Sequence, residues 1–257
     1  MNDSSSFFTI QFTVHKKNSY DKRKSLMCFS PEASFAGGIV ISSIGVAVVK
    51  KVHKPSQMVF AAIPLVFGVQ QIAEGFLWLS LQYPEYHQVQ NLSTYLYLTI
   101  ARVLWPMLMP LSVLLMEQDD KKKKVLLILL MMGSSVSLYY TYCLMFLNVT
   151  PEIMGHHIRY ISDYPESLAL PVFFIYSVAS ITPLFVSSIK RTRLFGTLMF
   201  LSSLVTGIFY FEYLTSVWCF FAAILSGVIF WIIKDSKMNE EENESNSSLN
   251  QIGWESE

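Results

Sequence analysis

Seven stretches of about 20 mostly apolar residues follow one another along this chain, and they constrain its fold more than any other feature. A helix needs about 20 apolar residues to cross the hydrocarbon of a membrane. Backbone groups within lipid must be bonded inside their own segment, so these stretches should be helices. We therefore expect an all-α membrane protein, a bundle of about seven transmembrane helices. The predicted spans are residues 33–49, 57–82, 93–115, 124–146, 168–189, 194–211 and 215–233.

The composition agrees with a multi-span membrane protein. Hydrophobic residues make up 52% of the chain and charged residues only 15%, which is too apolar for an ordinary soluble domain of this length. The net charge is zero, with basic clusters between the apolar stretches and an acidic tail. The expected partner is therefore the lipid bilayer, and no nucleic-acid partner is expected. No oligomeric state is predicted.

The basic residues alternate between the loops, and this alternation predicts the orientation. The loops after the first, third and fifth spans are basic, whereas the other three carry almost no Lys or Arg, with Arg159 as the exception. By the positive-inside rule the basic loops are cytoplasmic, which places the N-terminus outside and the C-terminus in the cytoplasm. The basic loop residues are Lys50, Lys51, Lys54, Lys121, Lys122, Lys123, Lys124, Lys190, Arg191 and Arg193.

The first 26 residues contradict this orientation, because their basic cluster would lie on the outer side. A start at Met27 would remove the whole cluster, and we favour this interpretation over a processed or targeting segment, since no clear signal-peptide core is present. We divide the chain into a basic extension (1–26) that need not belong to the mature protein, a seven-span membrane domain (27–233) and a disordered acidic cytoplasmic tail (234–257).

Two charged residues, Glu74 and Arg102, are expected at similar depth in the outer half of the bundle. Glu74 lies about eight residues before the outer end of the second span, and Arg102 about nine residues into the third. A charge at this depth is costly unless it is paired or hydrated, so it marks a candidate site. Arg102 can offer a forked donor to the Glu74 carboxylate. The alternative is a structural ion pair that only holds two helices in register.

Three neighbours of Glu74 extend this candidate site. Gln70, Gln71 and Trp78 share one helix face with Glu74. This face should look into the bundle, and the two glutamines favour binding over a simple ion pair. Trp218 of the last span is a second apolar wall, although Trp78, Trp105 and Trp218 also fit an interfacial aromatic belt.

A metal centre is a second candidate site at the outer face. Cys28 and Glu32 share a polar turn before the first span, and the longest outer loop, 147–167, contains His156 and His157. A thiolate, a carboxylate and one imidazole would suit a borderline metal such as zinc. The alternative is two solvated histidines, because no ligand spacing supports the site. The 147–167 loop and the Cys28 turn would together roof the polar pocket.

The residues quoted above lie in a pattern that is similar to a known family. The pattern comprises Met27-Cys-Phe-Ser-Pro-Glu-Ala-Ser-Phe35, Gln70-Gln-Ile-Ala-Glu-Gly-Phe-Leu-Trp78, Gly155-His-His-Ile158 followed by Tyr160, and Trp218-Cys-Phe-Phe-Ala-Ala223. The chain resembles, from Met27 to about Ile233, an uncharacterised family of bacterial multi-span membrane proteins. The resemblance implies a bacterial inner (plasma) membrane location. It implies no reaction, because the family has no assigned activity.

Three functions are compatible with these residues. The leading hypothesis is binding of a small molecule or lipid headgroup, for sensing or transport, in a pocket that opens to the outer face. Glu74 and Arg102 would supply charge, Gln70 and Gln71 hydrogen bonds, and Trp78 and Trp218 apolar walls. The alternative is a membrane-surface enzyme in which Cys28, or a metal, attacks a lipid. A structural membrane subunit is the third.

Overall fold

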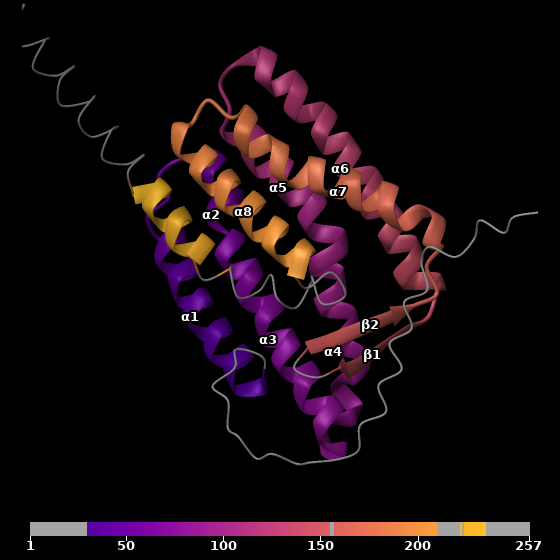
Figure 1. Cartoon of the computed structure of the whole chain (residues 1–257). Helices are drawn as coiled ribbons and strands as arrows, with labels where there is room; N and C mark the ends of the chain where they lie inside the picture. Colours follow the sequence, from indigo (N-terminus) through magenta and orange to yellow (C-terminus); the bar gives the residue numbers. More distant parts are fainter. Residues whose placement is uncertain (1–29, 155–156, 210–221, 223, 235–257) are drawn as a thin grey trace, which may run out of the picture.

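The computed structural model describes residues 30–154, 157–209, 222 and 224–234. Helices dominate this part, and Figure 1 shows them arranged as an elongated bundle with two strands at one end. The elements are α1 (Pro31–Val49), η1 (Pro55–Gln57), α2 (Met58–Ala61), α3 (Ile63–Gln82), η2 (Pro84–Val89), α4 (Gln90–Leu98), η3 (Thr99–Leu104), α5 (Trp105–Met116), α6 (Asp120–Phe146), β1 (Val149–Met154), β2 (His157–Ser162), α7 (Glu166–Val186) and α8 (Lys190–Phe209).

Five helical stretches among the described residues are long and apolar enough to cross a membrane. They are Pro31–Val49, Pro55–Gln82, Pro84–Met116, Asp120–Phe146 and Ser167–Val186, and they coincide with the first five predicted spans. The helix α8 covers most of the sixth, but its first turn is basic. The seventh lies partly outside the described residues, with a shorter apolar helix over Ile224–Lys234. The structure therefore supports an integral membrane protein, while the count of seven stays a prediction.

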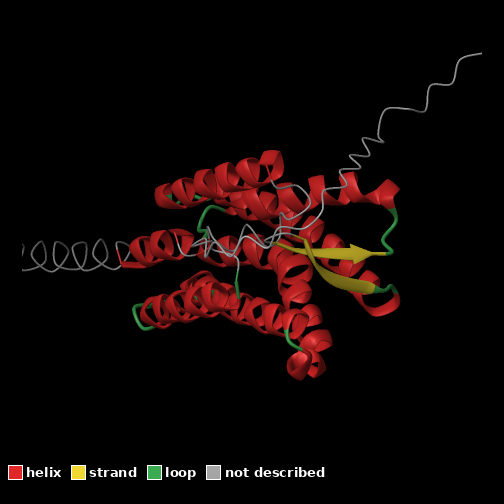
Figure 2. Cartoon of the chain, turned by 60° about the horizontal axis from the view of Figure 1, so that its bottom comes forward, coloured by secondary structure: helices red, strands yellow, loops and turns green. Residues whose placement is uncertain are grey.

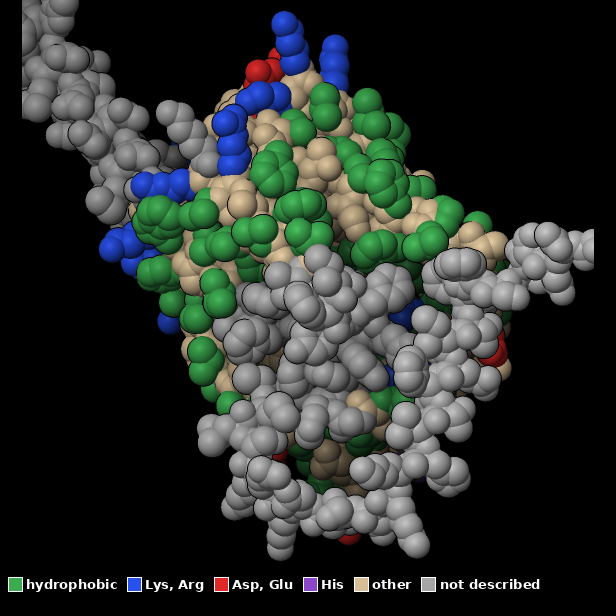
Figure 3. Space-filling model, viewed as in Figure 1, with side chains coloured by type: hydrophobic (Ala, Val, Ile, Leu, Met, Phe, Trp, Pro, Cys, Tyr) green, Lys and Arg blue, Asp and Glu red, His purple; other side chains and the backbone are tan. Residues whose placement is uncertain are grey.

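The helices run up and down the bundle, so the basic connections gather at one end. The loops after α1, between α5 and α6, and between α7 and α8 all lie towards the top of Figure 1, and Figure 3 shows Lys and Arg side chains gathered there above a band of apolar side chains. We call this the basic end. Contacts join its parts: Lys51 lies over the Phe230 ring at 5.1 Å and Arg191 over the Trp231 ring at 4.2 Å.

A β-hairpin at the opposite end, the hairpin end, corrects the expectation of an all-α bundle. The segment expected to be an outer loop forms an antiparallel pair of strands, in which Pro151 lies opposite Tyr160 and Ile153 opposite Ile158 (Figure 2). Aromatic and β-branched residues favour strands. The expectation of a helical bundle holds for the other described elements, and only the loop expected at this segment is corrected. The lack of a long apolar run indicated a loop, whereas its strand-forming residues favour a hairpin.

The helices α1 and α3 meet through glycines. A Cβ atom at Gly38 would lie 2.7 Å from Cγ1 of Ile72, and a Cβ atom at Gly45 would lie 2.9 Å from the backbone nitrogen of Leu65. Small residues let transmembrane helices approach closely, which compensates for the missing hydrophobic drive between helices in lipid. These contacts hold α3 close against α1.

Candidate functional site

The polar face of α3 lies inside the bundle, as the sequence predicts. The exposed fractions of Gln70, Gln71, Glu74 and Trp78 are 3%, 7%, 2% and 2%. A buried carboxylate and two buried amides are costly in an apolar bundle unless their polar atoms are bonded. Trp78 and Trp105, which is 4% exposed, are therefore interior residues and not part of an interfacial belt.

The two glutamines of this face have different partners. Gln71 donates its side-chain N–H to the Glu74 carboxylate at 3.0 Å, so it helps to hold the charge. Gln70 accepts from the indole N–H of Trp105 at 2.8 Å, and so joins α3 to α5. The Trp105 ring also packs on Phe67, with ring centroids 4.2 Å apart. One amide thus serves the carboxylate and the other positions the neighbouring helix.

Arg102 lies beside two tyrosine rings and not beside Glu74. Its guanidinium carbon is 5.7 Å from the centroid of Tyr140 and 5.1 Å from that of Tyr164, which are cation–π distances. No carboxylate of the described residues forms an ion pair with it. The ion pair expected between Glu74 and Arg102 is therefore not formed in this structure.

A π-helical turn accounts for the direction of Arg102. Arg102 belongs to η3, where hydrogen bonds reach back five residues, and the N–H of Trp105 donates to the carbonyl of Ile100. A wider turn rotates its side chains away from the positions that the 3.6-residue period of an α-helix gives. The expected pairing with Glu74 rested on the depth of Arg102 in its span, which does not fix the direction of its side chain. In the structure it contacts Tyr140 of α6 and Tyr164, which precedes α7.

Hydroxyl groups from two other helices fix this turn. The residue five positions after Ala101 is Pro106, which has no N–H to donate to the carbonyl of Ala101. The hydroxyl of Tyr176 in α7 donates to that carbonyl at 2.8 Å. Ser137 of α6 donates to the carbonyl of Val103 at 2.6 Å. Single π turns occur frequently at functional sites, and this one is held by neighbours on both sides.

The hairpin packs against α3 and α4. Ile158 of β2 is buried against Leu77 and Trp78. Tyr160 stacks on Tyr97 of α4, with ring centroids 5.5 Å apart and an angle of 11° between the rings. The second strand of the hairpin therefore lies beside the part of α3 that carries Leu77 and Trp78. A roof over a polar pocket stays a prediction.

The candidate metal ligands are not assembled by the described part of the chain. Cys28 and His156 lie outside the described residues, as does Trp218, and only the backbone of His157 is described. Glu32 is exposed in the first turn of α1, a helix capped by Ser30, whose hydroxyl accepts from the N–H of Ala33 at 3.2 Å. Within the described residues, no group of three His, Cys, Asp or Glu side chains is placed to hold a metal ion. The zinc site stays a prediction.

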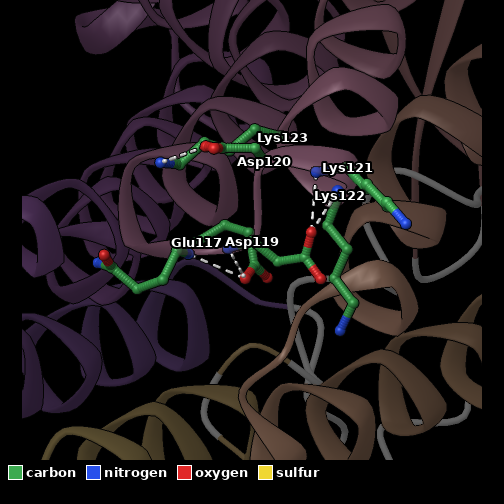
Figure 4. Close-up of polar contacts among 7 residues, drawn as sticks. Glu117, Asp119, Asp120, Lys121, Lys122 and Lys123 are labelled. Carbon is green, nitrogen blue, oxygen red and sulfur yellow. Dashed lines mark hydrogen bonds and ion pairs between the residues drawn. The ribbon is translucent and has the colours of Figure 1, made fainter.

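A second buried carboxylate, Glu117, lies at the basic end and was not predicted. It is 2% exposed. One oxygen accepts from the N–H groups of Gln118 at 2.9 Å and Asp119 at 3.0 Å (Figure 4), and the other accepts from the N–H of Ser188 at 2.7 Å. Glu117 therefore ties the α5–α6 loop to the α7–α8 loop, and Lys122 adds a bond to the Ser188 hydroxyl at 2.9 Å.

The hydrogen bonds of Glu117 decide its charge state. Burial alone would raise the pKa of Glu117, but the N–H groups of Asp119, Ser188 and Gln118 and the hydroxyl of Ser188 outweigh it and lower the pKa to about 2. A carboxylate that accepts several N–H bonds is stabilised in its ionised form. The only signal in the sequence was a glutamate directly after an apolar span, which does not reveal a partner 71 residues away.

One comparison with known proteins gives a match. A family model described as "Family of unknown function (DUF6629)" matches residues 27–244, which include every candidate residue from Cys28 to Trp218. The expectation of a family without an assigned activity is confirmed to this extent. Neither the search of curated proteins nor the search of solved structures gives a match.

Proposed function

The chain belongs to the DUF6629 family, whose function is unknown, and we propose that it binds a small molecule or a lipid headgroup in the hairpin half of its bundle, for sensing or transport. The observation that supports this proposal is the burial of Glu74, which is 2% exposed between helices apolar enough to span a membrane. Intramembrane carboxylates are expensive, and those that persist generally mark a site or a pathway.

The contacts on α3 suggest a division of roles. Glu74 supplies the charge that a ligand would meet, and Gln71 orients its carboxylate. Gln70 sets the position of Trp105, the first residue of α5. Trp78 is the apolar wall below the hairpin. In this proposal Trp218 is a second wall.

Orientation and location complete the proposal. The hairpin end would face outwards, because the basic end carries the lysines and arginines that the positive-inside rule assigns to the cytoplasm. The resemblance described above favours a bacterial inner membrane. A ligand would then reach Glu74 from the outer side, beside or beneath the hairpin.

Native mass spectrometry of the purified full-length chain tests this function. The protein is extracted in a maltoside detergent, and bound species are compared among the wild type, Glu74→Gln and a control, Glu85→Gln, at an exposed carboxylate. We expect a small molecule or lipid to be retained by the wild type and by the control. Glu74→Gln should retain it at least about tenfold less, because a charge-assisted contact is lost.

If the protein is only a structural membrane subunit, the mass spectra should differ from this expectation. Such a protein would carry no specific species, or would carry the same species in all three proteins, and either result would overturn the proposal. Gln71→Leu provides a second variant, because it removes one hydrogen-bond donor to the carboxylate without changing the charge itself. It should weaken retention in the same direction if Glu74 binds the ligand.

A further inference from the structure

We infer that the guanidinium of Arg102, held between the rings of Tyr140 and Tyr164, binds a phosphate group. This inference rests on the proposed function, because it names the chemistry of one part of the same ligand. An arginine fork matches the oxygen pairs of phosphate, and charge-assisted bonds of this kind are among the strongest in proteins. The phosphate can belong to a lipid headgroup or to a soluble molecule, and the experiment below separates these two sources.

The first argument is charge balance. Arg102 lies within Pro84–Met116, a stretch apolar enough to span a membrane. Its guanidinium lies over the rings of Tyr140 and Tyr164, and no carboxylate of the described residues forms an ion pair with it. Two ring faces attract the positive charge, but a guanidinium also carries five N–H donors that prefer oxygen acceptors. A bound oxyanion would supply both the negative charge and the acceptors.

The second argument is depth. Tyr140 lies six residues before the end of α6 at Phe146, which is about 9 Å along a helix axis. Tyr164 lies three residues before the apolar stretch Ser167–Val186. Arg102 and both tyrosines are partly exposed, so a ligand can approach them. The tyrosine side of the site therefore lies towards the end of the spans, where the phosphate of a lipid headgroup meets the apolar chains, and Arg102 reaches it from deeper in its own span.

The third argument is preorganisation. The π turn that presents Arg102 is fixed by Tyr176 on one side and Ser137 on the other. The hydroxyl of Tyr164 is buried beside the Arg102 side chain, and no described group accepts its proton. A buried hydroxyl proton without an acceptor costs free energy. Donation to a phosphate oxygen beside Arg102 would remove this cost.

The experiment uses the full-length protein in maltoside micelles, with two probes measured by isothermal titration calorimetry. One probe is dioctanoyl phosphatidic acid and the other is inorganic phosphate. We expect Arg102→Gln to weaken phosphatidate binding by at least about tenfold, since a charged fork is lost. Tyr164→Phe keeps the ring and removes only the hydroxyl, and should weaken binding about threefold. The matched control is Arg159→Gln, at a partly exposed arginine of the hairpin, and should bind as the wild type does.

The outcomes separate the two sources and the two proposals. If phosphatidate binds and inorganic phosphate neither binds nor competes, the source is a lipid headgroup; competition by inorganic phosphate at millimolar concentration indicates a soluble phosphate. Failure of both probes to bind the wild type, or equal binding by Arg102→Gln and the wild type, overturns the inference. In that case retention that still depends on Glu74 would leave the proposed function intact. Phosphate binding that depends on Arg102, with no species retained through Glu74, would support the phosphate site and overturn the proposed role of Glu74.

Discussion

Trp105 donates its indole N–H to the side-chain carbonyl of Gln70 at 2.8 Å, and so joins α5 to α3 across 35 residues of sequence. Trp105 is also the residue that directly follows the π turn with Arg102. The polar face of α3 and the arginine on the next helix are therefore parts of one scaffold, although no ion pair connects their charges.

The bond between Gln70 and Trp105 should contribute measurably to stability. Gln70→Leu leaves the buried indole N–H without this acceptor and should lower the free energy of unfolding by about 1–3 kcal/mol. Thermal and denaturant unfolding in detergent can measure this loss. A double-mutant cycle with Trp105→Phe should give a coupling of about 0.5–1.5 kcal/mol. Purely additive effects would show that the bond is absent in the protein.

Glu74 and Arg102 should behave as independent residues in a stability measurement. Because they form no ion pair, the destabilising effects of Glu74→Gln and Arg102→Gln should add within about 0.5 kcal/mol. The measurement is a double-mutant cycle on the ligand-free protein. A much smaller effect of the double variant than of either single one would instead reveal the ion pair that the sequence suggested.

Glu117 predicts a pH dependence of defined sign. The pKa of Glu117 is about 2 in the folded protein, against 4.5 for an ordinary glutamate. Its stabilising contribution is fully present above pH 4.5 and is lost as the pH falls from 4.5 towards 2. Glu117→Gln should cost on the order of 2 kcal/mol at pH 7, and this cost should shrink below pH 4.5.

Melting curves of the wild type and Glu117→Gln across this pH range measure the effect. Glu85→Gln is the matched control, because Glu85 is an exposed glutamate at the hairpin end. Its difference from the wild type should stay small at every pH. A constant difference between Glu117→Gln and the wild type down to pH 2.5 would contradict the prediction.

The contact between α1 and α3 should not tolerate a single added methyl group. A Cβ atom at Gly45 would lie 2.9 Å from the backbone nitrogen of Leu65, so Gly45→Ala must push the helices apart. We expect a loss of about 1–3 kcal/mol in unfolding free energy. Gly227→Ala is the control, since no described atom lies within 4 Å of its added Cβ. It should be neutral or stabilising, and equal losses at both positions would refute this account of the packing.

The features that the sequence predicted correctly depend on local patterns. Five spans follow from the length of apolar runs, and the inward direction of Gln70, Gln71 and Glu74 follows from the period of a single helix. The features that were missed depend on distant partners. The π turn needs Pro106, Ser137 and Tyr176 together, and Glu117 needs the backbone of Ser188. No hydropathy profile contains that information.

The π turn also changes how the helical stretch Pro84–Met116 has to be read. One extra residue in a turn shifts the rotational phase of everything after it by about 100°. The side-chain directions in α5 are therefore rotated relative to those expected by continuing α4. A single helical wheel drawn through both helices would group side chains that point in different directions. Relatives that lack one residue between 99 and 104 would bring the frames back into phase, and would need a different α5 surface to meet Gln70.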